Sequence, residues 1–157
     1  MSAIGKLLRP RSIAVVGASS DPSKTAGRPV AYLQKHRYAG AVYPVNPRLR
    51  EIGGLACWPD IGSLPETPEV ALVLLGAARA VEAVRELAAR GTAAAVVLAS
   101  GFGEAGPDGG ALQDQLKSAA GSMRLLGPNT IGLVNLADRI MLSPSGALEA
   151  DHLPSGD

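Results

Sequence analysis

The stretch "GASSDPSKTAGR" (residues 17–28) concentrates residue types that bind phosphate groups. Gly17 permits a tight turn after an apolar run, and Ala18 leaves the backbone open to a ligand. A helix that begins after Gly27 would direct its N-terminal amides to the same place, which favours an anion. The stretch predicts a phosphate-binding loop, although turns without a ligand are also rich in glycine and serine. Its donors and cations are Ser19, Ser20, Ser23, Thr25, Lys24 and Arg28.

Four further segments each follow an apolar run of strand length. They are "VNPR" (45–48), "GAAR" (76–79), "SGFGE" (100–104) and "GPNTIG" (127–132). Ligands of open parallel sheets bind beyond the carboxyl ends of the strands, so these segments should border the same site as residues 17–28. The candidate binding residues in them are Val45, Asn46, Pro47, Arg48, Gly76, Ala77, Ser100, Gly101, Phe102, Gly103 and Asn129.

The first loop departs from the dinucleotide fingerprint G-x-G-x-x-G. Ser19 and Pro22 stand at the second and third glycine positions. The fingerprint also places an acidic residue near the end of the second strand to bind the ribose, whereas this chain has Asn46 and Arg48 there. An arginine suits a phosphorylated ribose, which leaves NADP as an alternative. The pattern favours another nucleotide that bears an extra phosphate.

No catalytic set and no metal-ligand spacing is recognisable. His36 is expected on the polar side of a helix and His152 lies in the tail. Cys57, the only cysteine, stands beside Trp58 and is interpreted as a structural thiol rather than a nucleophile. The domain by itself is therefore expected to bind a ligand without catalysing a reaction.

These segments are positioned by alternating strands and helices. Apolar strands are predicted within 12–17, 41–47, 69–76 and 93–100, with a fifth and part of a sixth within 123–135, and helices within 27–37, 77–91 and 111–120. Near-continuous apolar strands that alternate with helices indicate an α/β fold: a Rossmann-like, doubly wound, mostly parallel sheet with helices on both faces.

Composition narrows the class of protein. The chain has 157 residues, which is enough for one domain, and a formal net charge of +1, which argues against a nucleic-acid partner. No signal peptide and no run of membrane-spanning length is present, and the single cysteine rules out an internal disulfide. We expect a cytoplasmic domain without a membrane partner.

The chain resembles the N-terminal CoA-binding domain of the NDP-forming acyl-CoA synthetases in three stretches taken together. They are "RSIAVVGASSDPSKTAGRPVAYLQKHRYAGAVYPVNPR", "AARGTAAAVVLASGFGE" and "LLGPNTIGLVN". This superfamily includes ADP-forming acetyl-CoA synthetase and is related to the α-subunit of succinyl-CoA synthetase. The resemblance covers roughly residues 5–143. Each motif is modest alone, and it is their order and spacing that make the resemblance specific.

The resemblance implies that coenzyme A (CoA) or acyl-CoA binds along the carboxyl edge of the sheet. Residues 17–24 would receive the phosphate-bearing portion, and 45–48 would lie by the adenosine. Residues 76–77 and 100–103 would border the pantetheine, and Asn129 would lie toward the reactive end. Three positions depart from the family pattern: Thr130 replaces a cysteine, Arg48 replaces a lysine, and Gly76 stands where proline is common.

The family interconverts acyl-CoA, phosphate and NDP with acid, CoA and NTP. The resemblance implies that the phosphorylated histidine and the ATP-grasp portion belong to further domains, which would be the partners of this one. We expect a CoA-binding domain at 1–143 and a linker toward the next domain at 144–157. Alternatives are a CoA-sensing regulatory domain of a Gcn5-type protein lysine acetyltransferase and a free-standing CoA-binding protein.

Overall fold

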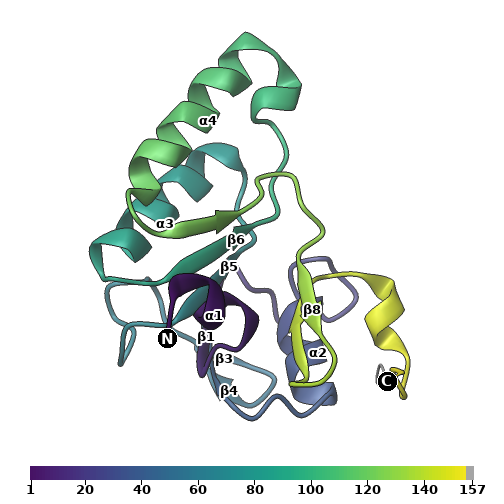
Figure 1. Cartoon of the computed structure of the whole chain (residues 1–157). Coiled ribbons are helices and arrows are strands. Elements are labelled where there is room, and N and C mark those ends of the chain that lie inside the picture. Colours follow the sequence, from purple (N-terminus) through teal and green to yellow (C-terminus); the bar gives the residue numbers. More distant parts are fainter. Residues whose placement is uncertain (155–157) are drawn as a thin grey trace.

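The computed structural model describes residues 1–154 and contains a five-stranded parallel sheet (Figure 1). Its strands lie in the order β2-β1-β5-β6-β7, and every neighbouring pair is parallel. This confirms the predicted Rossmann-like sheet. The strands are β1 (Ser12–Val16), β2 (Ala41–Val45), β5 (Val70–Val73), β6 (Ala94–Val97) and β7 (Arg124–Leu126).

The helices follow from local sequence signals. In α2, Pro29 occupies the first turn, where its missing N–H has no helical partner to lose. Helix α3 ends before Gly91, which adopts a positive φ of 86° as predicted for a glycine beyond a helix C-terminus. Helix α4 begins at Pro107 rather than at the predicted residue 111. The helices are α1 (Ala3–Leu8), α2 (Arg28–Lys35), α3 (Ala77–Ala89) and α4 (Pro107–Ala120).

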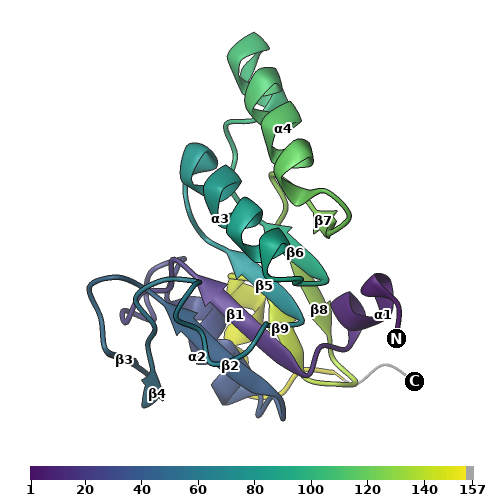
Figure 2. The same cartoon turned by 90° about the vertical axis from the view of Figure 1, so that its left-hand side faces the viewer.

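The sheet separates two hydrophobic cores, because alternate residues of each strand point to opposite faces. On one face, alternate residues such as Ala14 and Val73 pack against α3, α4 and the buried ring of Phe102. On the other, residues such as Val15 and Leu72 pack against α2 and against strand β9 (Ile140–Leu142). Figure 2 shows α3 and α4 on one side of the sheet and α2 on the other, which confirms helices on both faces.

Several short elements were not predicted. Residues 48–69, for which no strand or helix was predicted, contain the two-stranded ribbon β3 (Glu51–Ile52) and β4 (Leu55–Ala56). The anticipated partial sixth strand is β8 (Leu133–Asn135), which pairs antiparallel with β9 outside the main sheet. Two 3-10 helices, η1 (Gly103–Ala105) and η2 (Gly146–Glu149), complete the structure.

Residues 144–154, where a linker was expected, lie along the domain. Leu148 of η2 is 5% exposed and belongs to the core that covers α2. The carboxylate of Asp151 pairs with the ammonium of Lys35 at 2.9 Å. This part of the expected linker thus packs on the domain, because the burial of Leu148 depends on α2 and β9 rather than on its sequence neighbours. Residues 155–157 of the expected linker lie outside the described residues.

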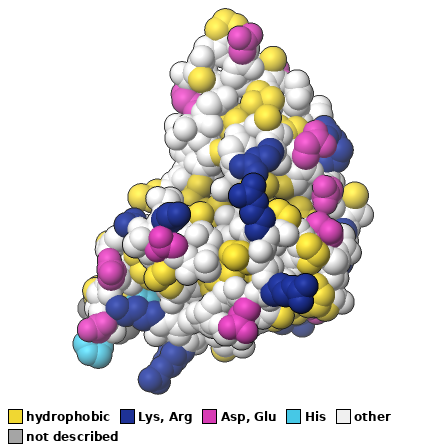
Figure 3. Space-filling view, turned by 180° about the vertical axis from the view of Figure 1, so that it is seen from behind, with side chains coloured by type: hydrophobic (Ala, Val, Ile, Leu, Met, Phe, Trp, Pro, Cys, Tyr) yellow, Lys and Arg dark blue, Asp and Glu magenta, His cyan; other side chains and the backbone are white. Residues whose placement is uncertain are grey.

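Charged side chains of both signs are interspersed over the face shown in Figure 3, in keeping with a formal net charge of +1. Among residues 1–154, no helix combines the length and hydrophobicity needed to cross a membrane.

Candidate functional site

The candidate residues gather at the point where the strand order reverses. The chain leaves β1 toward β2 on one side, and then returns to place β5 on the other side of β1. In open α/β sheets this reversal leaves a crevice beyond the carboxyl ends of the two strands. The loops that follow β1, β2, β5 and β6 therefore meet at one edge of the sheet, which we call the carboxyl edge.

Gly17 makes the turn out of β1. Its φ is 85°, its N–H donates to the carbonyl of Val45 at 3.0 Å, and a Cβ here would lie 2.7 Å from Cδ2 of Leu75. Glycine is therefore required both for the backbone conformation and for the close approach of the β5 segment. The turn brings the first loop directly beside the ends of β2 and β5.

The loop from Ser19 to Gly27 is held by its own hydrogen bonds. The hydroxyl of Ser19 accepts from the N–H of Asp21 at 3.1 Å, and the Asp21 carboxylate accepts from Ser23. The Ser23 hydroxyl is the main reason that the pKa of Asp21 lies below its usual value. The hydroxyls of Ser19 and Ser23 thus serve the loop itself, while Lys24 projects into solvent.

The N-terminus of α2 offers fewer free amides than the sequence predicted. The N–H groups of Gly27 and Arg28 both donate to the carbonyl of Lys24, and Pro29 has none. The guanidinium of Arg28 donates to the carbonyl of Pro144 at 3.3 Å. Positive charge and loop amides, rather than the first turn of the helix, are what this segment presents to an anion.

Asn46 joins the two loops that follow β1 and β2. Its side-chain N–H donates to the carbonyl of Ala18 at 2.9 Å, and its side-chain oxygen accepts from the N–H of Arg48 at 2.9 Å. Asn46 therefore fixes the position of Pro47 and Arg48, both of which are exposed. Val45 and Ala18 are buried, so their side chains pack in the protein interior and only their backbones can reach a ligand.

Two pockets adjoin at the carboxyl edge and share Leu75. One, of about 380 Å³, lies between the loop after β1 and the ends of β5 and β6; its lining residues are Thr25, Ala26, Leu74, Leu75, Gly76, Leu98, Ala99 and Ser100. The other, of about 250 Å³, reaches from β1 and β2 to α3. Its lining includes Val16, Gly17, Val45, Pro47, Ile61, Leu75 and Arg79. Both pockets have mainly apolar linings, although Asp60, Glu82 and Glu86 also line the smaller one, and we call the two together the trough.

The loop after β6 contributes backbone rather than an aromatic surface. The side chain of Phe102 is fully buried in the core below α4, so it is not available to a ligand. The Glu104 carboxylate accepts from the N–H groups of Gly101 at 2.6 Å and Phe102 at 3.2 Å. Hydrogen bonds from its own backbone and from Gly101 hold the pKa of Glu104 below its usual value. The N–H of Gly103 donates to Gln113 at 3.1 Å.

Asn129 lies beside this loop, although its sequence neighbours belong to the segment between β7 and β8. Its N–H donates to the carbonyl of Ala99 at 2.8 Å, and it adopts a positive φ of 54°. The structure therefore brings all five predicted segments to the same edge. Leu74, Leu75, Leu98, Ala99 and Arg79 were not among the predicted residues; the four apolar ones directly precede predicted residues at the strand ends, which is the signal that could have found them.

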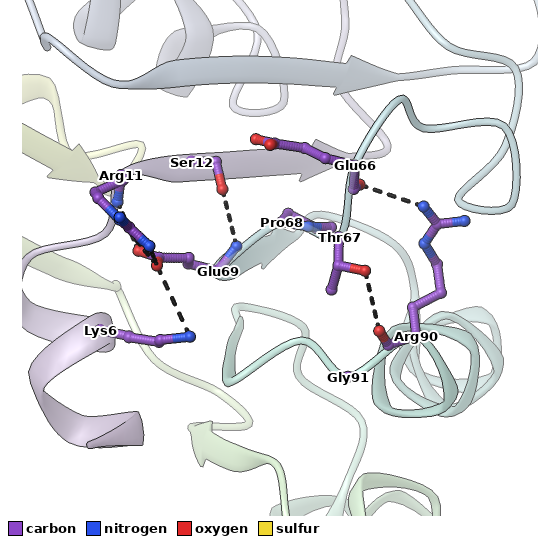
Figure 4. Close-up of a pocket in the computed structure, with 9 residues that line it drawn as sticks. All are labelled: Lys6, Arg11, Ser12, Glu66, Thr67, Pro68, Glu69, Arg90 and Gly91. Atoms are coloured by element: carbon purple, nitrogen blue, oxygen red, sulfur yellow. Dashed lines mark hydrogen bonds and ion pairs between the residues drawn. The ribbon is translucent and has the colours of Figure 1, made fainter. Parts of the chain in front are cut away.

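A larger pocket, of about 680 Å³, lies at the opposite edge of the sheet (Figure 4). Its polar groups bind one another: Glu69 accepts from the backbone and guanidinium of Arg11 and pairs with Lys6 at 3.7 Å. The Arg90 guanidinium donates to the backbone carbonyls of residues 62, 64 and 66. These contacts occupy most of the polar groups at the amino ends of the strands, although the buried Nε of Arg90 has no hydrogen-bond partner among the described residues.

Neither a metal site nor an activated thiol is present in the part of the chain that the structure describes. No group of His, Cys, Asp and Glu side chains among residues 1–154 is arranged to hold a metal ion. Cys57 is buried and its burial raises the pKa of the thiol. The carboxyl edge therefore has the character of a binding site for an elongated, phosphorylated ligand.

Comparison with known proteins identifies CoA as the ligand of the family to which the chain is similar. The model of a protein family described as "CoA binding domain" matches residues 11–135. The chain belongs to this CoA-binding domain family. A trans-feruloyl-CoA synthase, FCS1, from an unknown prokaryotic organism is 36% identical over 144 residues, which are 89% of this chain and 20% of that protein. The ADP-forming acetate–CoA ligase I of Archaeoglobus fulgidus is 35% identical over 83% of this chain and 19% of its own length.

The fold leads to the same group of proteins. The dinucleotide-forming acetyl-coenzyme A synthetase 1 of Candidatus Korarchaeum cryptofilum, in its apo form, superposes with a TM-score of 0.89 at 32% identity. The match covers 98% of this chain and 33% of that one. The CoA-binding domain thus spans between 19% and 28% of the length of these curated relatives and is homologous to part of the NDP-forming acyl-CoA synthetases.

The residues at the carboxyl edge fit CoA. This ligand has a diphosphate, a separate ribose phosphate, an adenine ring and a long pantetheine arm. Lys24 and Arg48 are exposed and directly adjoin, in sequence, the pocket-lining residues Thr25 and Pro47. No ion pair within residues 1–154 uses either of these two charged side chains. The trough around Leu75 provides apolar walls for the ring and the arm. No acidic residue directly follows β2 in sequence, where it would repel the ribose phosphate, although Asp60, Glu82 and Glu86 line the smaller pocket.

Proposed function

We propose that this domain holds CoA or acyl-CoA along the carboxyl edge and is the CoA-binding part of an NDP-forming acyl-CoA synthetase. The observation that carries the proposal is the trough around Leu75, with the exposed residues Lys24 and Arg48 next in sequence to Thr25 and Pro47, which line its two pockets. The diphosphate lies at the loop 17–24, and Arg48 binds the ribose phosphate through its guanidinium fork.

The remaining contacts follow from the same placement. The adenosine lies against Pro47 and Ile61 in the smaller pocket, and the pantetheine arm runs over Gly76, Ala77 and Ser100 in the larger one. Ser20 and the backbone of Gly17 and Ala18 line the diphosphate. The backbone of residues 101–103 and the side chain of Asn129 border the thiol end. Phe102 supports this end from the core and does not touch the ligand.

Nuclear magnetic resonance of the full chain tests this placement. On addition of CoA, we expect the amide signals of Gly17, Gly76 and Gly101 to shift, because their backbone borders the trough. The amide signals of Gly91 and Thr92, which lie at the amino ends of the strands, serve as the internal reference and should stay in place. Shifts confined to residues around the larger pocket of Figure 4 would contradict the proposal.

The chemistry is proposed to require further domains, one with a phosphorylated histidine and one of ATP-grasp type. This rests on homology to much longer acyl-CoA ligases. A protein that contains this domain should then form ATP from acyl-CoA, ADP and phosphate. Transfer of an acetyl group to a lysine peptide, without ATP formation, would instead favour a CoA-sensing domain of a Gcn5-type acetyltransferase. We place the CoA-binding residues within 1–143, with residues 144–154 packed on them, and the domain in the cytoplasm without a nucleic-acid or membrane partner.

A further inference from the structure

A third cavity, of about 480 Å³, lies away from the carboxyl edge. It is enclosed by the C-terminal end of α2, the turn between β8 and β9, and the segment 151–153. Figure 3 shows histidine and Lys or Arg side chains gathered at this end of the molecule. We call it the basic pocket; its lining residues are Lys35, His36, Arg37, Leu136, Arg139, Met141, Asp151, His152 and Leu153.

Part of this basic cluster has a structural role. The ammonium of Lys35 pairs with Asp151 at 2.9 Å and also donates to the carbonyl of Glu149. The imidazole Nε2 of His36 is hydrogen-bonded to the carbonyl of Leu148 at 2.7 Å. These contacts hold residues 148–151 against α2. They also use the single carboxylate that lines the pocket.

The two arginines have no comparable role within residues 1–154. Neither the Arg37 nor the Arg139 guanidinium makes an ion pair or a hydrogen bond there. Asp138, which directly precedes Arg139, is bound to Arg9 at 2.9 Å and to Asn135 at 2.7 Å. Two uncompensated guanidinium groups from different elements thus line one cavity. Arginine forks of this kind match the oxygens of a phosphate group.

Both arginines also occupy backbone positions that favour glycine. Arg37 follows the C-terminus of α2 with a φ of 57°, and Arg139 closes the β8–β9 turn with a φ of 59°. Glycine is the usual residue at both kinds of position, because a side chain in this conformation is strained. Nothing in the packing of the described residues requires an arginine at either place.

We propose that the basic pocket binds a phosphate group, either the inorganic ion or a phosphate ester, and that Arg37 and Arg139 are its principal ligands. The apolar side chains of Leu136, Met141 and Leu153 line the same cavity and suit the organic part of an ester. This site is separate from the CoA site. Its existence does not depend on the proposed function.

The histidines make the test direct. The chain has two histidines and both line the basic pocket, so their imidazole signals report its occupancy without labelling other residues. Inorganic pyrophosphate and phenyl phosphate are titrated into the full chain. We expect saturable shifts of both imidazoles. Tighter binding of phenyl phosphate would identify an ester as the ligand, and tighter binding of pyrophosphate the inorganic ion.

The variants Arg37→Gly and Arg139→Gly separate binding from folding. Each should weaken binding about tenfold, the usual effect of losing a hydrogen bond to a charged group, while the melting temperature is unchanged or higher. A double variant of the exposed residues Lys117 and Arg124 to alanine removes the same charge elsewhere and should bind normally. Absence of imidazole shifts in the native chain, or equal binding by the glycine variants, would overturn the proposal.

Discussion

At the scale of single residues, Lys24 and Arg48 are assigned to different phosphates of CoA. Replacing either with alanine should weaken CoA binding by about 1–3 kcal/mol, the range for a hydrogen bond to a charged group. Dephospho-CoA lacks the ribose phosphate, so its affinity should fall for Lys24→Ala and change little for Arg48→Ala. Titration calorimetry with both ligands measures this. Equal losses for the two ligands with Arg48→Ala would refute the assignment of that residue.

Glu69 gives a residue-scale prediction of pH dependence. Its carboxylate is 10% exposed, and the hydrogen bond from the guanidinium of Arg11 is the main cause of its lowered pKa. A carboxylate whose pKa is lowered by folding adds stability above its unfolded pKa, and this stability is lost as the pH falls through the lowered value. Glu69→Gln should therefore destabilise the chain at neutral pH.

Urea unfolding of both proteins at about pH 7 and about pH 3 measures the effect, since the interval spans the usual carboxyl pKa and the range below it. The gap in unfolding free energy between the two proteins should narrow at the lower pH. A gap of constant size would mean that the Glu69 carboxylate is not responsible. Glu51→Gln, an exposed acid outside the ion pairs of residues 1–154, is the matched control.

At the scale of elements, the start of α4 depends on Gly109. A Cβ at Gly109 would collide with the carbonyl of Phe102, whereas Gly110 has open space within 4 Å. Alanine ordinarily stabilises a helix interior by about 0.5–1 kcal/mol relative to glycine. We expect that gain for Gly110→Ala and a loss of about 1–3 kcal/mol for Gly109→Ala, because the loop after β6 must move.

Thermal or urea unfolding measures the free energy of unfolding of Gly109→Ala and Gly110→Ala, and each variant serves as the control for the other. Gly109→Ala should also reduce CoA affinity, because it displaces the backbone of residues 101–103. Equal stabilisation by both substitutions would show that the loop is not held tightly against α4.

The same element shows where sequence reasoning succeeds and fails. The buried strands were predictable from near-continuous apolar runs of strand length, and α3 from apolar residues that recur with the period of a helix. The first turn of α4 was missed because Gly109 and Gly110 are poor helix formers, and the helix is set there by Pro107 and by contact with Phe102. Strand β9 was missed because its apolar run is only three residues long, Ile140–Leu142, and its burial comes from distant α2 and the sheet.

The candidate site was predictable to the level of loops. The alternation of strands and helices predicted a parallel sheet, and the segments that follow its strands were therefore expected at one edge. The individual hydrogen bonds within these segments could not be predicted from the sequence, because they depend on the folded loop geometry. The Asn46 side chain donates to the carbonyl of Ala18, and the Glu104 carboxylate accepts from the N–H groups of Gly101 and Phe102. Phe102, a candidate from its place in a loop, is buried because α4 covers it.

At the scale of the whole molecule, residues after 143 contribute to the folded unit. Leu148→Ala should lower the free energy of unfolding by about 2–4 kcal/mol, as expected for a buried leucine. Glu149→Ala, an exposed neighbour in the same 3-10 helix, should have almost no effect. Urea unfolding measures both. If Leu148→Ala is as stable as the native chain, residues 144–154 act as a linker and the domain ends at 143.

The central claim is that the carboxyl edge binds CoA rather than a dinucleotide. Titration calorimetry of the full chain with CoA, and with NADP in parallel, tests it most directly. Saturable binding of CoA without binding of NADP is the predicted result, since the loop lacks the second and third glycines of the dinucleotide fingerprint. Binding of NADP without binding of CoA would contradict the account.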